Sequence, residues 1–245
     1  MNKQKLYNGF YNAIKESYFK YLLFGDRSDE KLKPLHAWVG NTIKMYIRDL
    51  YDVFFLNGKE VQTEGAYYTK IIDVAIVKKG VKVIPKPLGP KRVFYIPKIE
   101  TAISIKFITS NFKQNANNYF ENLLGECANL RARGIKFGHF VVFRDKIPYF
   151  KSNGEIKGWE TLEDQYIEKY IKLFKDKKFQ HVPNFIGVEI ININPIVEEF
   201  YNRKPTFTDE EIRKVGRIKI QNGIDNTQLS DEIKKFILDN FNLQQ

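Results

Sequence analysis

The spacing of hydrophobic positions predicts that the chain begins with helices and continues with strands. Residues 3–24 and 35–56 carry aromatic and aliphatic side chains at helical spacing, and a polar loop at 25–34 separates them. Residues 67–78 instead form a β-branched apolar run, which is typical of a buried strand and ends at Lys79-Gly80. The pattern therefore changes from helical to extended between residues 56 and 67.

The rest of the chain alternates short apolar runs with longer amphipathic segments. Helices followed by interleaved strands and helices predict an α/β fold, in which a mixed β-sheet is flanked by helices. The N-terminal helices and a C-terminal extension with a weaker pattern would be additions to this core. The further strands are predicted at 81–84, 92–96, 102–108, 137–143 and 185–193, and the further helices at 118–133, 161–175, 208–215 and 230–241.

Length and composition favour one basic globular domain. No linker requires a second domain in the 245 residues, so we expect a single domain over 1–245 with its catalytic core at about 60–193. The 40 Lys and Arg residues against 29 Asp and Glu give a net charge of +11, which suits a polyanion such as nucleic acid, although basic surfaces also serve solubility.

Cysteine and histidine are scarce. The one cysteine, Cys127, excludes an intramolecular disulfide, and three histidines are too few for a Cys/His zinc site. We find neither an apolar signal core nor an apolar run of about 18 residues, so we expect a soluble cytoplasmic protein without a membrane partner.

Asp73 is the first residue whose chemistry stands out, because it is the single acid in the run Ile-Ile-Asp-Val-Ala-Ile-Val. A buried ionised carboxylate is costly unless a cation or a metal neutralises it. The strand period of two places Asp73 on one face with Ile71 and Ala75. Asp73 could therefore bind a metal, or it could be an edge carboxylate that a neighbouring cation satisfies.

Lys106 is a matching exception in Ala-Ile-Ser-Ile-Lys-Phe-Ile, where it shares one face with Ser104 while apolar side chains occupy the other. The simpler interpretation is a lysine that reaches solvent from a strand end. Asp73 and Lys106 together, however, suit phosphodiester hydrolysis. In that reaction a carboxylate holds a divalent metal, while an ammonium orients water and offsets the developing charge.

One carboxylate holds a metal poorly, so we expect a second acid on the helix that follows. Glu121 also fits a capping box that starts at Asn118, whereas Glu126 lies too far along the helix to cap it. A surface pair with Arg133 is the structural alternative for Glu126. We favour Glu126 and keep Glu121 as the alternative. Glu64 could reach a second metal, or it could be a solvated loop acid.

At these residues the sequence resembles the PD-(D/E)xK nucleases, and type II restriction endonucleases in particular. The family pattern is an Asp on one strand, then Asp or Glu, any residue and Lys on the next. Here the second element reads Ser104-Ile105-Lys106, without that acid. One branch of the family has this serine and takes its second carboxylate from the following helix.

The segments 126–131 and 138–143 resemble the helix and the following strand of that branch, as does the pair Gln114-Asn115. The resemblance covers about residues 65–145. The sequence departs from the pattern in two ways: no Pro precedes the strand Asp, and the gap from the Lys to the favoured Glu is longer than in the branch.

The resemblance implies a restriction-endonuclease-like fold and Mg²⁺ as cofactor. The expected site comprises Asp73, Ser104, Lys106 and the helix glutamate. The resemblance also implies a homodimer that cuts double-stranded DNA at a short specific sequence, with a cognate DNA methyltransferase in the same system.

Polar and basic side chains around the Pro/Gly-rich turn and before the third long helix are candidates for DNA contact. Lysine and arginine suit phosphates, whereas Asn and Gln can read adenine edges. A solvated loop is the alternative interpretation. The candidates are Lys91, Arg92, Lys113, Gln114, Asn115 and Asn117.

Two other functions remain open. A DNA-repair or junction-resolving nuclease of the same fold would have no neighbouring methyltransferase gene. A catalytically inactive DNA-binding protein would bind DNA in EDTA and would not cleave it in Mg²⁺.

Overall fold

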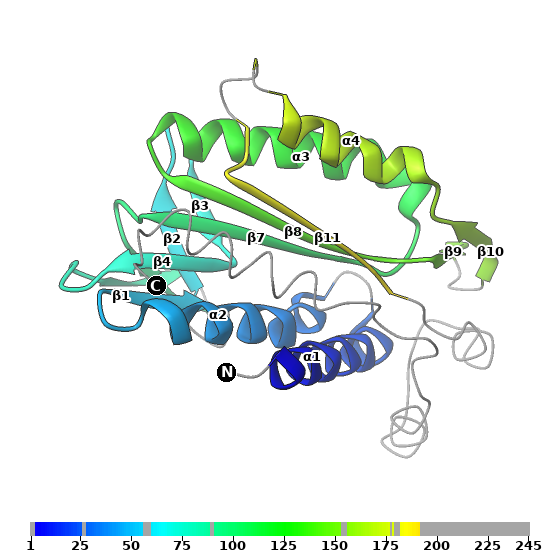
Figure 1. Ribbon diagram of the computed structural model, residues 1–245, viewed down its shortest axis with the longest axis horizontal. Coiled ribbons are helices and arrows are strands. Elements are labelled where there is room, and N and C mark those ends of the chain that lie inside the picture. Colours follow the sequence, from blue (N-terminus) through cyan, green and yellow to red (C-terminus); the bar gives the residue numbers. More distant parts are fainter. Residues whose placement is uncertain are drawn as a thin grey trace.

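A five-stranded mixed β-sheet separates two pairs of helices (Figure 1). The computed structural model describes residues 3–25, 28–55, 60–88, 91–152, 156–176, 178 and 182–191. The helices are α1 (Lys3–Phe24), α2 (Lys33–Ile47), α3 (Phe112–Ala132) and α4 (Asp164–Lys175), with a short 3-10 helix η1 (Asp29–Lys31). The strands are β1 (Tyr51–Phe55), β2 (Glu60–Glu64), β3 (Thr69–Ile72), β4 (Val74–Lys78), β5 (Ile84–Leu88), β6 (Lys91–Tyr95), β7 (Thr101–Ile108), β8 (Lys136–Arg144), β9 (Lys146–Phe150), β10 (Ile156–Thr161) and β11 (Phe185–Ile191).

The main sheet has the order β1-β4-β7-β8-β11. The pairs β1–β4 and β4–β7 are antiparallel, and the pairs β7–β8 and β8–β11 are parallel. The central strands β7 and β8 are almost continuously buried, as expected for strands covered on both faces. The predicted α/β class with a mixed sheet flanked by helices is therefore confirmed.

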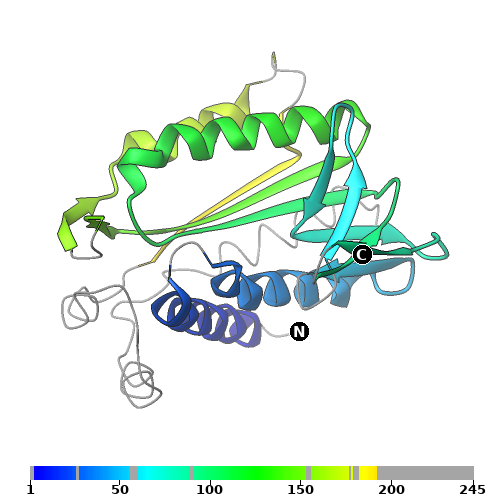
Figure 2. The same ribbon diagram turned by 180° about the vertical axis from the view of Figure 1, so that it is seen from behind.

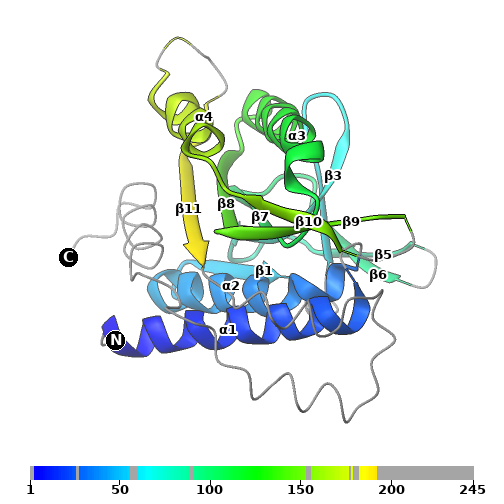
Figure 3. The same cartoon turned by 90° about the vertical axis from the view of Figure 1, so that its right-hand side faces the viewer.

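Helices α1 and α2 cover one face of the sheet, and α3 and α4 cover the other (Figures 1, 2 and 3). Helix α3 connects β7 to β8, and α4 lies between β8 and β11. Right-handed crossovers between successive parallel strands place both helices on the same face. Along β7, Ile103 and Ile105 pack into the core shared with α1 and α2, whereas Ala102 and Ile108 pack into the core shared with α3.

A second, four-stranded sheet has the order β3-β2-β6-β5, and β9 and β10 form a separate two-stranded pair. The predicted single strand at 67–78 is wrong, because it is divided between the two sheets. β3 pairs with β2 in the small sheet, β4 pairs with β1 and β7 in the main sheet, and Asp73 lies between them. Of the three residues predicted to share a face, Ile71 and Asp73 line one cavity, whereas Ala75 packs into the core shared with α3.

The predicted second helix is too long. α2 ends at Ile47, and the aromatic segment Tyr51–Phe55 forms β1, where it pairs with β4 and packs against the helical core. Leu50, which the helical pattern would bury, is exposed. Residues 81–83 are irregular, and the strand predicted there begins only at Ile84.

The predicted start of the third long helix is also wrong. α3 begins at Phe112, whose buried ring contacts the rings of Phe143 and Tyr166 edge-on. Asn118 therefore lies inside the helix and cannot begin a capping box.

Several other boundaries differ from the prediction. α4 begins at Asp164, because the residues before 162 form β10. Strands β2, β9 and β10 were not predicted. The predicted helices at 208–215 and 230–241, and the last two residues of the strand predicted at 185–193, lie outside the described residues.

Candidate active site

A cavity opens where β4 and β7 part. The two strands pair at only three positions, from Val74 opposite Ile103 to Ile76 opposite Thr101. At Asp73 the main chain turns into the small sheet, and the side chain takes over the strand pairing: Asp73 Oδ2 accepts a hydrogen bond of 2.7 Å from the backbone N–H of Ile105. This bond holds the carboxylate in a fixed position at the point of separation.

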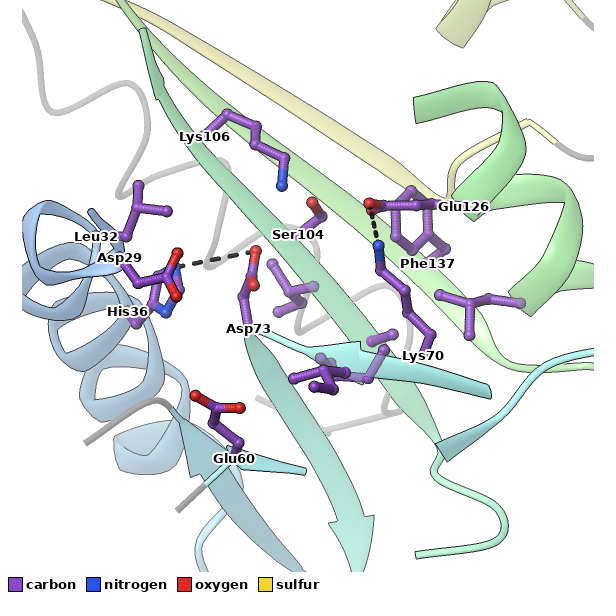
Figure 4. A pocket seen from close by; sticks show the side chains of 15 residues that line it. Asp29, Leu32, His36, Glu60, Lys70, Asp73, Ser104, Lys106, Glu126 and Phe137 are labelled. Carbon is purple, nitrogen blue, oxygen red and sulfur yellow. Dashed lines mark hydrogen bonds and ion pairs between the residues drawn. The ribbon is translucent and has the colours of Figure 1, made fainter. Parts of the chain in front are cut away.

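The cavity has a volume of about 230 Å³ and is lined from both helical layers and both sheets. Asp73 lies between His36 on one side and Lys106, Ser104 and Glu126 on the other (Figure 4). The charged and polar side chains that line the cavity are Asp29, His36, Glu60, Lys70, Asp73, Ser104, Lys106 and Glu126.

Asp73 is held ionised. Burial by itself would raise the pKa of this carboxyl, but the electrostatic effects of His36 and then Lys106, together with the hydrogen bond from Ile105, outweigh the burial and lower the pKa. An ionised carboxylate in a partly buried position is the form that attracts a divalent cation.

Lys106 stays charged for the reciprocal reason. Burial alone would lower the pKa of its ammonium, but the charges of Asp73 and Glu126 reverse the effect and raise the pKa above the usual value. Within the described residues, the ammonium makes no hydrogen bond, so its N–H groups are directed at the cavity rather than at a fixed partner. Ser104 lies beside it with a buried hydroxyl that also has no hydrogen-bond partner among these residues.

Glu126 projects into the cavity from α3 and is buried, at 8% exposed. The sequence alternative of a surface pair with Arg133 is wrong: Glu126 Oε1 instead accepts a hydrogen bond of 2.6 Å from Lys70 Nζ, and Arg133 pairs with Glu64. Lys70 comes from β3, so the small sheet is tied to α3 across the cavity.

The other two predicted acids lie elsewhere. Glu121 is exposed on α3 and does not line the cavity. Glu64, at the end of β2, also lies outside the cavity lining; it accepts a hydrogen bond from the Tyr95 hydroxyl and pairs with Arg133 at 3.3 Å. Of the predicted carboxylates, the structure thus brings together Asp73 and Glu126.

Four of the six predicted DNA-contact residues lie at the far end of α3 from Glu126, namely Lys113, Gln114, Asn115 and Asn117. Gln114 is 12 residues before Glu126, which corresponds to about 18 Å along a helix. Lys113 pairs with Glu163, and Asn115 donates to the backbone carbonyl of Asn111. Gln114 and Asn117 are exposed on the first turns of the helix, and Lys91 and Arg92 begin β6, with side chains outside the described part.

Sequence reasoning missed His36 and Lys70. His36 lies on the apolar face of α2, in helical register with the buried Val39 and Ile43, so a polar residue at a core position was the available signal. Lys70 gave no comparable signal, because its role depends on the separation of β3 from β4.

The carboxylate oxygens that line the cavity are the type of ligand atom that Mg²⁺ binds. Asp73 and Glu126 each keep one carboxylate oxygen without a hydrogen bond among the described residues, and carboxylate oxygens with water are the ligands that Mg²⁺ prefers. In the described part of the chain, no three His, Cys, Asp or Glu side chains are close enough together to hold a metal ion. Two carboxylates with water would therefore form the ligand set.

Comparison with known proteins adds no family assignment. No protein-family model matches the chain, and no curated protein matches it. Each helix in the described residues is too short or too polar to traverse a lipid bilayer.

Proposed function

We propose that this protein is a Mg²⁺-dependent endonuclease of the type II restriction class, which hydrolyses double-stranded DNA at a short specific sequence. The observation that carries the proposal is the convergence of Asp73, Lys106 and Glu126 on one cavity from three separate elements. A charged ammonium that makes no hydrogen bond to the described residues, beside two carboxylates, is the arrangement that phosphodiester hydrolysis needs.

Each side chain has a distinct task in this proposal. Asp73 and Glu126 would hold the divalent ion, and Asp73 is fixed for this by the Ile105 N–H. The Lys106 ammonium would orient the attacking water by a hydrogen bond and offset the negative charge that develops on the phosphate. The Ser104 hydroxyl, buried and without a partner among the described residues, can donate to the same water or phosphate oxygen.

The ion, when bound, would lower the pKa of a coordinated water and polarise the phosphate. The net charge of +11 supports the choice of DNA, because neutralised phosphates release counterions and strengthen association. A homodimer and a cognate methyltransferase belong to the same proposal through the family resemblance.

The direct test is digestion of phage and plasmid DNA by the purified protein in Mg²⁺, followed by sequencing of the fragment ends. Discrete fragments with a common end sequence are expected. A smear would contradict site specificity, and intact DNA across a range of Mg²⁺ concentrations would contradict nuclease activity.

An inactive DNA-binding protein is the second candidate, and the pairing of Glu126 with Lys70 favours it, because that ion pair occupies one oxygen of the proposed metal ligand. This candidate predicts equal DNA binding in EDTA and in Mg²⁺ without cleavage.

A further inference from the structure

His36 is a buried polar side chain that the proposed nuclease chemistry does not use. The His36 side chain projects from α2 and forms part of the cavity wall, and the residue is 1% exposed. Neither ring nitrogen has a hydrogen-bond partner in the described residues. A buried polar group without a partner is costly, and a ligand that supplies the missing interaction removes that cost.

The distance from His36 Nε2 to Asp73 Oδ2 is 3.9 Å, which exceeds a hydrogen bond. A single bridging water with two hydrogen bonds of about 2.8 Å would separate the atoms by about 4.6 Å at a tetrahedral angle. An ion with bonds of about 2.1 Å to each atom would separate them by about 3.4 Å at a tetrahedral angle and by at most about 4.2 Å. The observed separation is within the range for a shared metal ion.

We propose that His36 and Asp73 form a position for a divalent transition-metal ion, on the opposite side of Asp73 from Glu126. Figure 4 shows Asp73 between these two groups, so its carboxylate can face both positions. Asp29 lines the cavity on the His36 side and adds negative charge there. Water would complete the coordination.

The imidazole determines the class of ion. Mg²⁺ favours oxygen ligands, whereas imidazole nitrogen suits zinc and its transition-metal neighbours. An imidazole binds a metal ion through the lone pair of a ring nitrogen, and neither ring nitrogen of His36 is engaged by a hydrogen bond within the described residues. A catalytic role for this ion rests on the proposed nuclease function, but the binding of the ion does not.

The test is a titration of the metal-free, full-length protein with Zn²⁺ alone, observed through the nitrogen-15 signals of the histidine rings. The chain has three histidines, so three sets of ring nitrogen signals are followed, and each set is called the pattern of its histidine. The His36 pattern should shift at about equimolar Zn²⁺. His36→Gln should remove this pattern and weaken Zn²⁺ binding by at least about tenfold, and Asp73→Asn should weaken it comparably.

His139→Gln is the matched control, because the His139 ring is also buried but is stacked beside Tyr170 and does not line the cavity. Its Zn²⁺ affinity should stay within about twofold of the wild type, as expected for a group that touches no ligand. If His36→Gln does not fold, the wild-type spectrum and Asp73→Asn still decide the question.

An unmoved His36 pattern in the wild type, or an unchanged Zn²⁺ affinity in His36→Gln, would overturn the inference. A shifted His36 pattern in a protein that never cuts DNA would support the metal position and contradict the nuclease proposal. Cleavage in Mg²⁺ with an unmoved His36 pattern would do the reverse.

Discussion

Lys70 Nζ lies 2.6 Å from Glu126 Oε1, so a lysine of the small sheet is bonded to the acid that we propose as a metal ligand. A cation in the same position competes with Mg²⁺ for that carboxylate. The pair therefore links metal binding to the contact between β3 and α3.

Replacement of Lys70 by Met should show this competition. Glu126 would be left buried without its partner, and we expect a loss of about 1–2 kcal/mol in the free energy of unfolding in EDTA. Mg²⁺ should raise the melting temperature of Lys70→Met more than that of the wild type, because the ion then neutralises Glu126 without displacing a lysine.

Lys113→Met is the control for this experiment. Lys113 also forms a short pair with a glutamate, Glu163, but the two side chains are 40% and 45% exposed. An exposed pair contributes little to stability, and Mg²⁺ should have the same effect as in the wild type. An identical Mg²⁺ response in Lys70→Met and Lys113→Met would refute the competition.

The two helix glutamates can be separated by parallel substitutions. Glu126→Gln should lower the rate of Mg²⁺-dependent cleavage by at least about a hundredfold, because one of two carboxylate ligands is lost. Glu121→Gln should stay within about twofold of the wild type, since Glu121 is exposed and outside the cavity. Rates measured on one plasmid substrate decide this; a greater loss in Glu121→Gln would reverse the assignment.

Stability should depend on His139 at acidic pH. Burial lowers the pKa of His139 to about 3 in the folded protein, whereas an unfolded histidine has a pKa of about 6.5. Between these values the unfolded chain binds the extra proton, so the free energy of unfolding falls as the pH falls, by about 1.4 kcal/mol per unit for this one group.

His139→Gln lacks this titration, and its stability should vary less between pH 6 and pH 4 than that of the wild type. Urea unfolding at several pH values measures the difference. Equal slopes for the two proteins would mean that His139 is protonated in the folded state or reaches solvent.

The sequence was informative where one local property determines the structure. Continuous apolar runs predicted β7 and β8, because parallel strands covered on both faces exclude polar side chains. The same runs made Asp73 and Lys106 stand out. A charge in an otherwise buried strand is visible in the sequence without any knowledge of its partner.

Features that depend on contacts between distant segments could not be predicted. The apolar run through Asp73 has no Pro or Gly at the break, and only the pairing of β3 with β2 separates it into two strands. The partners of Glu126 and Asp73 are Lys70, 56 positions away, and the Ile105 N–H, 32 positions away. Periodicity does not report such distances.

The start of α3 shows a conflict between a local signal and packing. Asn118 and Glu121 have the spacing of a capping box, which is a local preference of about 1 kcal/mol. Burial of Phe112 against Phe143 and Tyr166 is worth more and extends the helix toward β7.

The central claim is tested most directly by cleavage of supercoiled plasmid in Mg²⁺ by the wild type, Asp73→Asn and Lys106→Met, with DNA binding measured in EDTA for the same proteins. Asparagine keeps an oxygen for the Ile105 N–H, and methionine keeps the length of the lysine, so both variants should fold. We predict cleavage by the wild type, at least about a hundredfold slower cleavage by each variant, and DNA binding within about tenfold of the wild type. Wild-type rates in either variant would contradict the assignment of this cavity as the active site.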